Sequence, residues 1–346
     1  MTRSFNRMAL IDQDSDDTVR LSVEDASELA VEVLSKLGYT GEEAKIVTAH
    51  LVSNAMSGYT FAGLPRILAI ADSPELKKPR RPVTVIHETP ISALLDGGNH
   101  VGYISVARAV EVTVEKARQS GVAVVGVSNS WFSGRNAYYL EKIARAGFVG
   151  IHTVSSPAVV VPIGARRPAL GTNPIAFALP GEEHPFIFDM GTASTMHGEL
   201  LLKAFLDEDF PDVVGVDDAG LPTRRAKAIV DGGILPFGGH KGYGLSVAIQ
   251  ALGLLAGAKR RNGQVSDFGF LFIAFDPGLL MPPQEFKAQL AELFAFIKSR
   301  PRQDGVEEIR IPSERAFRER ELRREQGILV PRQVYGRLNA ILSGQQ

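Results

Sequence analysis

The chain contains no cysteine among its 346 residues. This absence excludes disulfide scaffolds, thiolate zinc sites, iron–sulfur clusters and cysteine nucleophiles. Neither sign of charge is in excess, because 38 lysines and arginines oppose 39 aspartates and glutamates and leave a net charge of -1. That balance attracts neither nucleic acid nor an anionic membrane surface, and we expect neither as a partner. Any chemistry must therefore come from oxygen and nitrogen groups or from a bound cofactor.

Several sequence motifs are also absent. The seven histidines never fall at a ligand spacing such as HExxH, so we predict no metal site. There is no GxSxG elbow for a serine nucleophile and no complete GxGxxG turn after a strand, which argues against the common dinucleotide fold. The N-terminal stretch MTRSFNRMALIDQDSDD turns acidic before an apolar run develops. We therefore expect no secretory signal and a cytoplasmic protein.

Helical patterns occupy both ends of the chain. Residues 1–20 are a polar lead-in that need not be ordered. Ser22 with Asp25, and Thr40 with Glu43, are capping signals for two amphipathic runs that end near residues 38 and 57, which predicts a helical hairpin. Further helices are expected in the tail, at about residues 283–299, 313–326 and 333–342.

Strand-like patterns occupy the middle. Short apolar runs bounded by turn residues are typical of strands. They lie at about residues 83–88, 91–96, 122–127, 148–154, 175–179, 186–190 and 268–275, with helical runs at about 104–119, 136–146 and 242–258. This order predicts an α+β fold, in which residues 81–299 form a sheet domain and residues 21–80 plus 300–346 form a helical domain.

Two glycine-containing segments stand beside predicted strands. Residues 164–177 hold a tight turn made of Gly171, Thr172 and Asn173. Residues 188–195 end a strand on Asp189 and then offer hydroxyl groups near a helix start, which suits a phosphate. Taken singly, an ordinary turn and a plain helix cap account for these segments equally well.

Two further segments combine glycine with polar or aromatic groups. Residues 236–245, PFGGHKGYGL, place three glycines and Lys241 before an apolar helix. This resembles a phosphate cradle, although no Ser or Thr follows the lysine as in a Walker loop. Residues 127–139 hold the only tryptophan, Trp131, with Arg135. An arginine beside aromatic rings more often packs or meets a carboxylate than touches a substrate.

Together these segments resemble the type-2 malate/L-lactate dehydrogenase family over about residues 22–343. The family also holds ureidoglycolate and sulfolactate dehydrogenases, diketogulonate reductase and piperideine-2-carboxylate reductase. Its marks here are LLDGGNHVGY, GTNPIAFALP, FDMGTAS, DDAGLPT, LPFGGHKGYGL and IRIPSERAFRERELRREQGI. The resemblance implies a homodimeric oxidoreductase that uses NAD or NADP and acts on a small 2-hydroxy acid, 2-oxo acid or cyclic imino acid. It also implies a non-Rossmann fold with a mixed, largely antiparallel central sheet.

The resemblance also assigns cofactor-binding positions. Thr172 and Asn173 would line the nicotinamide end. The remaining positions are Phe186, Ile187, Phe188, Asp189, Met190, Gly191, His240, Lys241, Ser313, Glu314 and Arg315. The choice between NAD and NADP stays open. Arginines are available for a ribose 2′-phosphate at positions 166, 167, 224 and 225, but their abundance alone decides nothing.

The chain departs from the family pattern at three positions. Tyr59 stands where the family usually has a proton-donating histidine, and Gly63 stands where it has an arginine. Phe132 replaces a second histidine. Reduction of a carbonyl by hydride needs a proton for the developing alkoxide, and a positioned acid contributes typically 10²–10⁴-fold. Phe132 cannot supply that proton.

Tyr59 is the candidate proton donor, with Lys241 and Asp189 as further candidate catalytic groups. A phenol is a weak acid near neutrality unless a nearby cation or helix dipole supports it. The alternative is that Tyr59 simply fills a pocket wall. The candidate substrate pocket consists of Trp131, Phe132, Arg135 and Tyr138.

A cyclic imine can enter as an iminium, already protonated, so loss of histidine would cost less with such a substrate. We therefore expect an imine, or a bulkier keto substrate flanked by aromatic rings, to be preferred over pyruvate or oxaloacetate. The alternative from another class is a family member that has lost catalysis and binds nucleotide in a regulatory role. The intact glycine loop argues against complete loss of function.

Overall fold

The computed structural model describes residues 17–261, 264–265 and 267–345. The chain divides into two compact units. The terminal unit comprises the residues up to Asp72 together with Arg315 onward, and the sheet unit comprises Ser73–Glu314. These boundaries differ from the predicted ones near residues 80 and 300. The extra residues belong to the sheet unit through contacts such as those of Glu75, whose carbonyl oxygen accepts a hydrogen bond from the Asn99 side chain at 3.1 Å.

The terminal unit contains the predicted helical hairpin. Its helices are α1 Val23–Lys36, α2 Gly41–Met56, α3 Pro65–Ala71, α10 Glu314–Gln326, which begins at the unit boundary, and α11 Arg332–Leu342, with the short 3-10 helix η1 Thr60–Ala62. The Ser22 hydroxyl accepts from the Asp25 amide, and Thr40 forms a full capping box with Glu43. The helix starts that the capping signals predict are confirmed.

The start of the chain corrects one expectation. The sequence pattern places residues 18–20 in the polar lead-in, but strand β1 (Thr18–Leu21) pairs antiparallel with strand β14 (Ile328–Pro331). The partner strand lies more than three hundred residues away in the sequence, so no local pattern could reveal the pairing.

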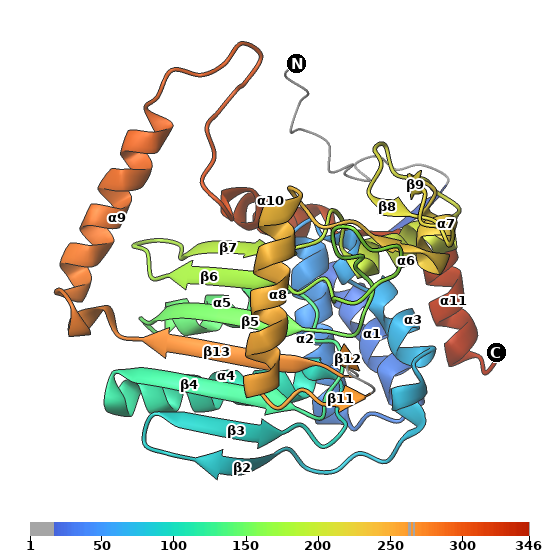
Figure 1. Ribbon diagram of the computed structural model, residues 1–346, viewed down its shortest axis with the longest axis horizontal. Coiled ribbons are helices and arrows are strands. Elements are labelled where there is room, and N and C mark those ends of the chain that lie inside the picture. Colours follow the sequence, from blue (N-terminus) through green and yellow to red (C-terminus); the bar gives the residue numbers. More distant parts are fainter. Residues whose placement is uncertain (1–16, 262–263, 266, 346) are drawn as a thin grey trace. The chain divides into compact units, whose positions relative to one another are not determined.

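The sheet unit is built on a seven-stranded sheet, shown in Figure 1. Its strands are β2 Thr84–Glu88, β3 Ser92–Asp96, β4 Val122–Ser128, β5 Val149–Ser155, β6 Ile175–Leu179, β7 Phe186–Met190 and β13 Gly269–Phe275. The order is β2-β3-β4-β13-β5-β6-β7, and only β3 and β4 run parallel. The predicted mixed, largely antiparallel, non-Rossmann sheet is therefore confirmed.

Helices cover both faces of this sheet. Helices α4 (Gly102–Ser120) and α5 (Asn136–Arg145) pack on one face, where Phe270 and Phe272 of β13 are fully buried. Helix α8 (His240–Leu255) packs on the other face and stands in front of the sheet in Figure 1. Close approach there depends on Gly253, because a Cβ at this position would lie 1.8 Å from the Ser155 hydroxyl oxygen.

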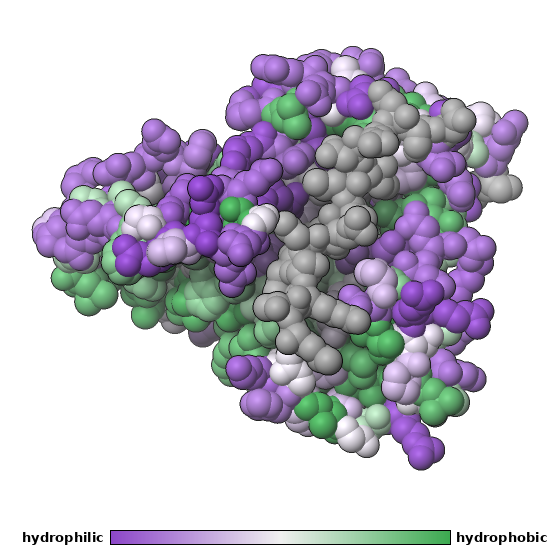
Figure 2. Space-filling model, turned by 90° about the horizontal axis from the view of Figure 1, so that it is seen from above, coloured by the Kyte–Doolittle hydropathy of each residue, from purple (hydrophilic) through white to green (hydrophobic). Residues whose placement is uncertain are grey.

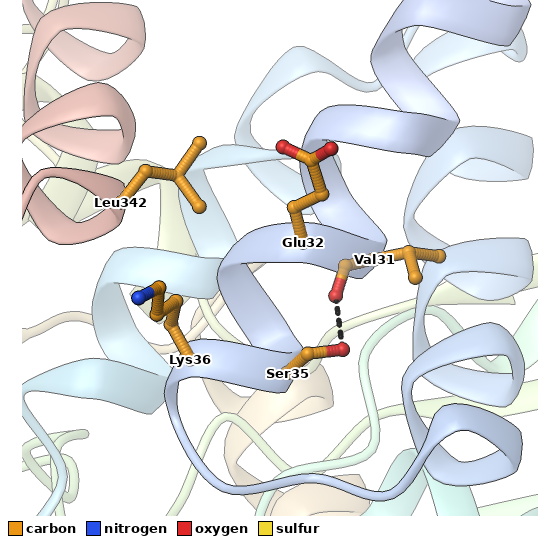
Figure 3. A pocket seen from close by; sticks show the side chains of 5 residues that line it. All are labelled: Val31, Glu32, Ser35, Lys36 and Leu342. Atoms are coloured by element: carbon orange, nitrogen blue, oxygen red, sulfur yellow. Dashed lines mark hydrogen bonds between the residues drawn. The ribbon is translucent and has the colours of Figure 1, made fainter.

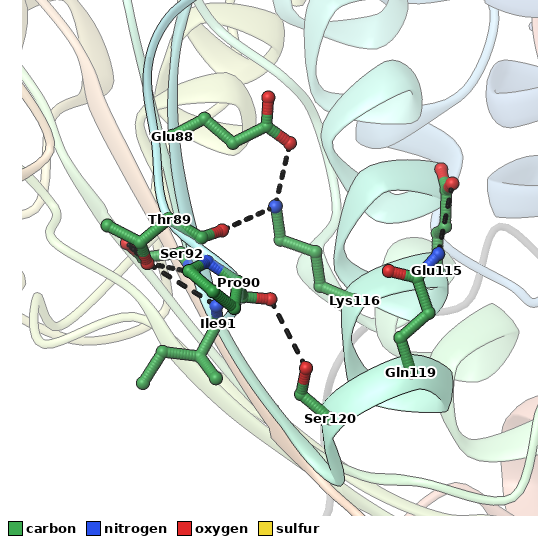
Figure 4. A network of polar contacts seen from close by, with 9 residues as sticks. All are labelled: Glu88, Thr89, Pro90, Ile91, Ser92, Glu115, Lys116, Gln119 and Ser120. Carbon is green, nitrogen blue, oxygen red and sulfur yellow. Dashed lines mark hydrogen bonds and ion pairs between the residues drawn. The ribbon is translucent and has the colours of Figure 1, made fainter.

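A buried lysine fixes the β2–β3 turn to α4 (Figure 4). The Lys116 ammonium donates to the Glu88 carboxylate and to the Thr89 carbonyl oxygen, each at 2.8 Å. The Ser120 hydroxyl donates to the Pro90 carbonyl oxygen at 3.3 Å. Because α4 connects the two parallel strands, these contacts hold the β3–α4–β4 crossover against the sheet edge.

The rest of the sheet unit consists of shorter elements. They are η2 Pro74–Lys77, α6 His197–Leu206, α7 Ala226–Asp231, η3 Pro277–Leu279, α9 Pro283–Lys298, the small sheet β10-β8-β9 (Gly233–Ile234, Gly215–Val216, Pro222–Thr223) and the pair β11 (Arg260–Arg261) and β12 (Gln264–Val265). The α6 and α7 helices share a small core with Val160, Phe210 and Ile234. In the part of the chain that the structure describes, no helix is both long enough and apolar enough to cross a bilayer.

Candidate active site

Three of the four segments that the sequence singled out meet beyond the end of β7. The backbone amide and the hydroxyl of Thr192 both donate to the Thr172 carbonyl oxygen, at 2.9 and 3.0 Å. The Phe237 amide in turn donates to the Thr192 carbonyl oxygen at 3.0 Å. A side chain is excluded at Gly242, because a Cβ there would lie 2.0 Å from the Phe237 carbonyl oxygen. Hydrogen bonds therefore join three segments: the GTN turn (residues 171–173), the GTAS loop (residues 191–194) and the glycine loop (residues 236–245).

The glycine loop ends at the start of α8. Gly238 and Gly239 have φ angles of 56° and 60°, and space is open where a side chain would project from either of them. Gly239 is the N-cap residue of α8 and has no side chain that could occupy the free amides of the helix start. His240 and Lys241, which follow it, are exposed. Bare amides at a helix N-terminus beside a lysine ammonium suit a phosphate group. These residues fit the diphosphate of a dinucleotide.

The GTN turn is oriented inward. Thr172 and Asn173 are both buried, and Asn173 has a left-handed φ of 36°. The Asn173 carboxamide bonds to Ser156, Ser246 and Gln250 rather than to the surface. Its contribution to a ligand site is therefore the shape of the turn, not a free amide group.

Strand β7 directs alternate side chains to the two faces of the sheet. Ile187 is buried on the α5 side, whereas Phe188 is partly exposed on the α8 side. Phe186 meets the ring of Phe294 from α9, with the ring centroids 5.5 Å apart. Gly191 then leaves the strand where a Cβ would lie 2.6 Å from the Met196 sulfur. This glycine allows the GTAS loop to fold back on the strand end.

Asp189 joins the fourth segment to β7. One carboxylate oxygen of Asp189 accepts from the Ala137 amide at 2.9 Å, in the first turn of α5. Residue Arg135, at the cap position of that helix, provides no side-chain cap. Burial raises the pKa of Asp189 above its usual range, and the Ala137 amide, the Arg135 charge and the Asn136 amide offset part of that rise. The carboxylate thus acts as a distant cap for α5.

The other end of the fourth segment is also tied down. The Asn129 side chain donates to the Asp96 carboxylate at 2.5 Å, and the Gly98 amide donates to the same oxygen at 2.8 Å. Asp96 and Asn129 lie at the carboxyl ends of β3 and β4, the two parallel strands. The segment between Asn129 and Ala137 is therefore held at both ends.

The aromatic residues of this segment differ in exposure. Trp131 is buried, and its indole N–H donates to the Asn99 carbonyl oxygen at 3.1 Å. Phe132 is half-buried and packs edge-to-face on Trp131, with ring centroids 5.1 Å apart. Tyr138 is also half-buried, and the Lys142 ammonium lies 4.5 Å from its ring centroid. Trp131 therefore supports Phe132 from within the core, and Phe132 and Tyr138 are the more accessible rings.

Tyr59 has a cationic neighbour that the sequence analysis did not pair with it. The Arg315 guanidinium lies 5.0 Å from the Tyr59 ring centroid. Gly58, with φ 82°, leaves room for it, because a Cβ there would lie 2.9 Å from an Arg315 nitrogen. A side chain at Gly63 would meet Ala55 at 2.9 Å. Tyr59 and Arg315 both belong to the terminal unit.

The predicted tail positions Ser313 and Glu314 lie at the end of the sheet unit. The Ser313 hydroxyl donates to the Ile187 carbonyl oxygen of β7 at 2.5 Å, and Ser313 has a left-handed φ of 78°. The Glu314 carboxylate accepts from the Lys298 ammonium at 2.7 Å and from the Ile311 amide at 3.0 Å. Two of the stretches expected to bind cofactor, β7 and the tail, are therefore in contact.

Other candidates are accounted for by the core. His152 is fully buried and stacks on Phe272 with ring centroids 3.7 Å apart, so it is part of the core. Burial lowers its pKa to about 3, so it is neutral. No group of three or more potential metal ligands was found in the described ranges.

A shallow hollow of about 510 Å³ lies on the terminal unit (Figure 3). It is lined by Val31, Glu32, Ser35, Lys36 and Leu342, from α1 and α11. The only hydrogen bond drawn there joins the Ser35 hydroxyl to the Val31 carbonyl oxygen, one helical turn apart. None of the predicted site residues lines this hollow, and we assign no chemistry to it.

Known proteins resemble this chain in both sequence and fold. The sequence pattern described as malate/L-lactate dehydrogenase matches residues 21–339. L-sulfolactate dehydrogenase of Methanocaldococcus jannaschii is 33% identical over 331 residues, which cover 93% of this chain and 96% of that protein. The Delta(1)-pyrroline-2-carboxylate/Delta(1)-piperideine-2-carboxylate reductase of Pseudomonas putida is 37% identical over 253 residues, or 69% and 71% of the two chains.

The fold is similar to a solved structure as well. Malate dehydrogenase from Pyrococcus horikoshii superposes with a TM-score of 0.85 at 30% identity, over 96% of this chain and 97% of that one. The resemblance that the motifs indicated is thereby confirmed, and so is an oxidoreductase that acts on CH–OH or C=N bonds. The chain belongs to the malate/L-lactate dehydrogenase family.

Proposed function

We propose that this protein transfers a hydride between NAD or NADP and a small carboxylate substrate, either a 2-oxo or 2-hydroxy acid or a cyclic imine. The supporting observation is the convergence of the GTN turn, the GTAS loop and the glycine loop at the start of α8. The open amides of that helix start and the Lys241 ammonium bind the cofactor phosphates in this proposal. The nicotinamide ring supplies or receives the hydride.

Tyr59 is the proposed proton donor for a carbonyl substrate. The Arg315 guanidinium lies over its ring, 5.0 Å from the centroid, and this cation–π contact holds the ring in place. Phe132 occupies the position of the second family histidine and has no proton to give. Lys241 belongs to the proposed phosphate site, and the Asp189 carboxylate holds α5.

A cyclic imine is the substrate class that we favour. Phe132 and Tyr138 are the accessible rings of the fourth segment, and apolar walls accept a carbon skeleton better than an additional charge. An iminium carries its proton into the site, so an enzyme with one weak acid still reduces it. Among the relatives, the Pseudomonas putida protein is named as a reductase of two such cyclic imines.

Cofactor binding and turnover are tested separately. Titration of NADH and of NADPH, followed by nucleotide fluorescence, measures binding and decides between the two cofactors. Steady-state assays with pyruvate, oxaloacetate and Δ1-piperideine-2-carboxylate then measure turnover. We expect binding of one cofactor and the highest kcat/KM with the cyclic imine. A preference for pyruvate or oxaloacetate ends the imine proposal, and binding without any turnover favours the nucleotide-binding alternative.

We further propose a homodimer, located in the cytoplasm. Apolar side chains of the sheet unit are exposed on α8 and α9, including Leu255 at 76% and Phe296 at 59% exposure. Figure 2 shows green, apolar side chains along the lower edge of the arm on its left, the α9 region of Figure 1. A second copy of the chain is the partner that we expect to cover these residues.

A further inference from the structure

A buried amide network joins the GTN turn to the middle of α8. We propose that Gln250, which no sequence motif singled out, is a positioning residue that fixes the nicotinamide end of the site. The Gln250 side-chain oxygen accepts from the Asn173 side chain at 2.7 Å and from the Gly171 amide at 3.2 Å. Its side-chain nitrogen lies 3.5 Å from the Ser156 carbonyl oxygen. One carboxamide thus holds both flanks of Thr172.

Asn173 has little freedom to adopt another position. Its side-chain nitrogen also donates to the backbone and hydroxyl oxygens of Ser246, each at 3.0 Å, and its oxygen accepts from the Ser156 amide at 3.2 Å. The residue is fully buried and has a left-handed φ of 36°, a conformation that asparagine adopts more readily than most other residues. Asn173 therefore fixes the shape of the turn, and Gln250 holds Asn173.

Gly171 shows how tightly the network is packed. A Cβ at this position would lie 2.1 Å from the Ser156 hydroxyl oxygen and 2.5 Å from the Asn173 side-chain oxygen. Loss of the Gln250 oxygen would leave the Gly171 amide without this acceptor, and a buried amide left unpaired is costly. The turn would then shift to find another partner.

The location of Gln250 on α8 gives the network a functional consequence. Helix α8 begins with the residues proposed to bind phosphate and continues to Gln250, ten residues after His240. Both ends of a bound dinucleotide would therefore be set by one rigid helix. Hydride transfer depends steeply on the placement of the reacting atoms. This inference rests on the proposed function, because the GTN turn matters for catalysis only if the nicotinamide lies against it.

The test compares Gln250→Met, which keeps the side-chain length but removes both polar atoms, with Gln289→Met. Gln289 is an exposed residue of α9 that bonds only to Glu285 among the contacts described. For Gln250→Met we expect NADH affinity within about threefold of wild type and a kcat lower by about tenfold. The primary isotope effect with nicotinamide deuterated at C4 should increase, because misplacement slows hydride transfer itself. Gln289→Met should match wild type in all three measurements.

Gln250→Glu provides the rescue, and it remains informative if Gln250→Met does not fold. Its protonated carboxyl mimics the carboxamide, because the C=O oxygen accepts the same two hydrogen bonds and the O–H can donate to the Ser156 carbonyl oxygen in place of the side-chain N–H. The ionised carboxyl sets an oxygen without a proton against that carbonyl oxygen. We therefore expect a kcat that is nearest to wild type at low pH and that falls relative to wild type as the introduced carboxyl ionises. A Gln250→Met enzyme with unchanged kcat and isotope effect overturns the role of Gln250, as does a Gln250→Glu enzyme with wild-type pH dependence. Absence of cofactor oxidation by the wild-type enzyme overturns the proposed function and this role with it.

Discussion

Tyr59 is the residue that we propose as the proton donor, at the position that the motif resemblance gives to a histidine. The structure adds the Arg315 guanidinium, 5.0 Å from the centroid of its ring. The pair could not be predicted from the sequence, because the two residues are distant along the chain and neither lies in a motif with the other. The space that Gly58 leaves for Arg315 likewise became evident only from the folded chain.

We expect Tyr59→Phe to affect the two substrate classes unequally. The variant should lose about 10²–10⁴-fold in kcat/KM with a 2-oxo acid, because the alkoxide then lacks its positioned acid. With a cyclic imine the loss should stay below about tenfold, since the iminium arrives protonated. Steady-state kinetics measure both. Tyr335→Phe, a half-buried tyrosine of α11, is the matched control. Equal losses with both substrates would contradict the role of Tyr59.

Asp189 is the second residue whose role the structure clarifies. The sequence placed it among the candidate catalytic groups, and the folded chain shows its carboxylate bonded to the first turn of α5. A distant helix cap leaves no local sequence signal, because the helix and its capping residue are far apart along the chain. Its role in proton transfer remains a prediction that kinetics must test.

Asp189→Asn is expected to change how stability depends on pH. Burial raises the folded pKa of Asp189 above the ordinary value of 3.8, so ionisation of this group opposes folding. Well below pH 3.8 the carboxyl is protonated in both the folded and the unfolded protein, so it does not change the free energy of unfolding. As pH rises from there through the raised folded pKa, the unfolded chain releases its proton first and the free energy of unfolding falls. Asp189→Asn removes this decline.

Urea unfolding at a series of pH values measures the effect as the difference in unfolding free energy between variant and wild type. The free energy of unfolding of Asp189→Asn should increase relative to wild type as the pH rises from 3.8 through the raised folded pKa. Asp231→Asn, an exposed carboxylate at the end of α7, should give a curve parallel to wild type. A parallel curve for Asp189→Asn as well would show that the pKa of Asp189 is not raised in the folded protein.

Among the elements, those with strong local signals were predicted well. The caps at Ser22 and Thr40 give the starts of α1 and α2, and α4 ends at Gly121, with φ 76°, close to the predicted end of that helical run. The shortest strands were not predicted. Strand β1 exists through its pairing with β14, and the two-residue strands β8, β9 and β10 exist through one another. Their sequences are too short to carry a period.

The convergence of the glycine loops was only partly predictable. Each loop was recognised from its glycines, and the family resemblance grouped them as cofactor-binding stretches. The contacts that join them involve backbone atoms of Thr172, Thr192 and Phe237 together with the Thr192 hydroxyl, and no local sequence pattern shows which of these atoms meet. Gln250 was missed for a related reason, because one polar residue on an apolar helix is unremarkable until its partners are known.

The proposed phosphate site at the start of α8 can be tested by substitution of Lys241. Lys241→Met should weaken NADH binding about fivefold, which corresponds to about 1 kcal/mol, because a phosphate loses one cationic partner. The difference from wild type should disappear at about 1 M salt, where exposed charges are screened. Fluorescence titration measures both. Lys36→Met, an exposed lysine of α1, is the control, and equal affinities for all three proteins at low salt would exclude Lys241 from the phosphate site.

At the scale of the whole molecule, the exposed apolar residues of the sheet unit make oligomeric state the informative property. Light scattering after gel filtration should give the mass of two chains for the wild-type protein. The double variant Leu255→Glu, Phe296→Glu should elute as one chain, because charges replace apolar surface that a second copy covers. Leu221→Glu, at an exposed leucine between β8 and β9, should remain a dimer. A monomeric wild type would contradict the homodimer.

Transfer of a labelled hydride tests the account most directly. The enzyme is mixed with its preferred cofactor, reduced and carrying deuterium at C4 of the nicotinamide, and with Δ1-piperideine-2-carboxylate or a 2-oxo acid. Mass spectrometry of the product then follows the label. The account predicts one deuterium at the former C=N or C=O carbon. Tight binding of the reduced cofactor with no deuterium in any product, across both substrate classes, would contradict it.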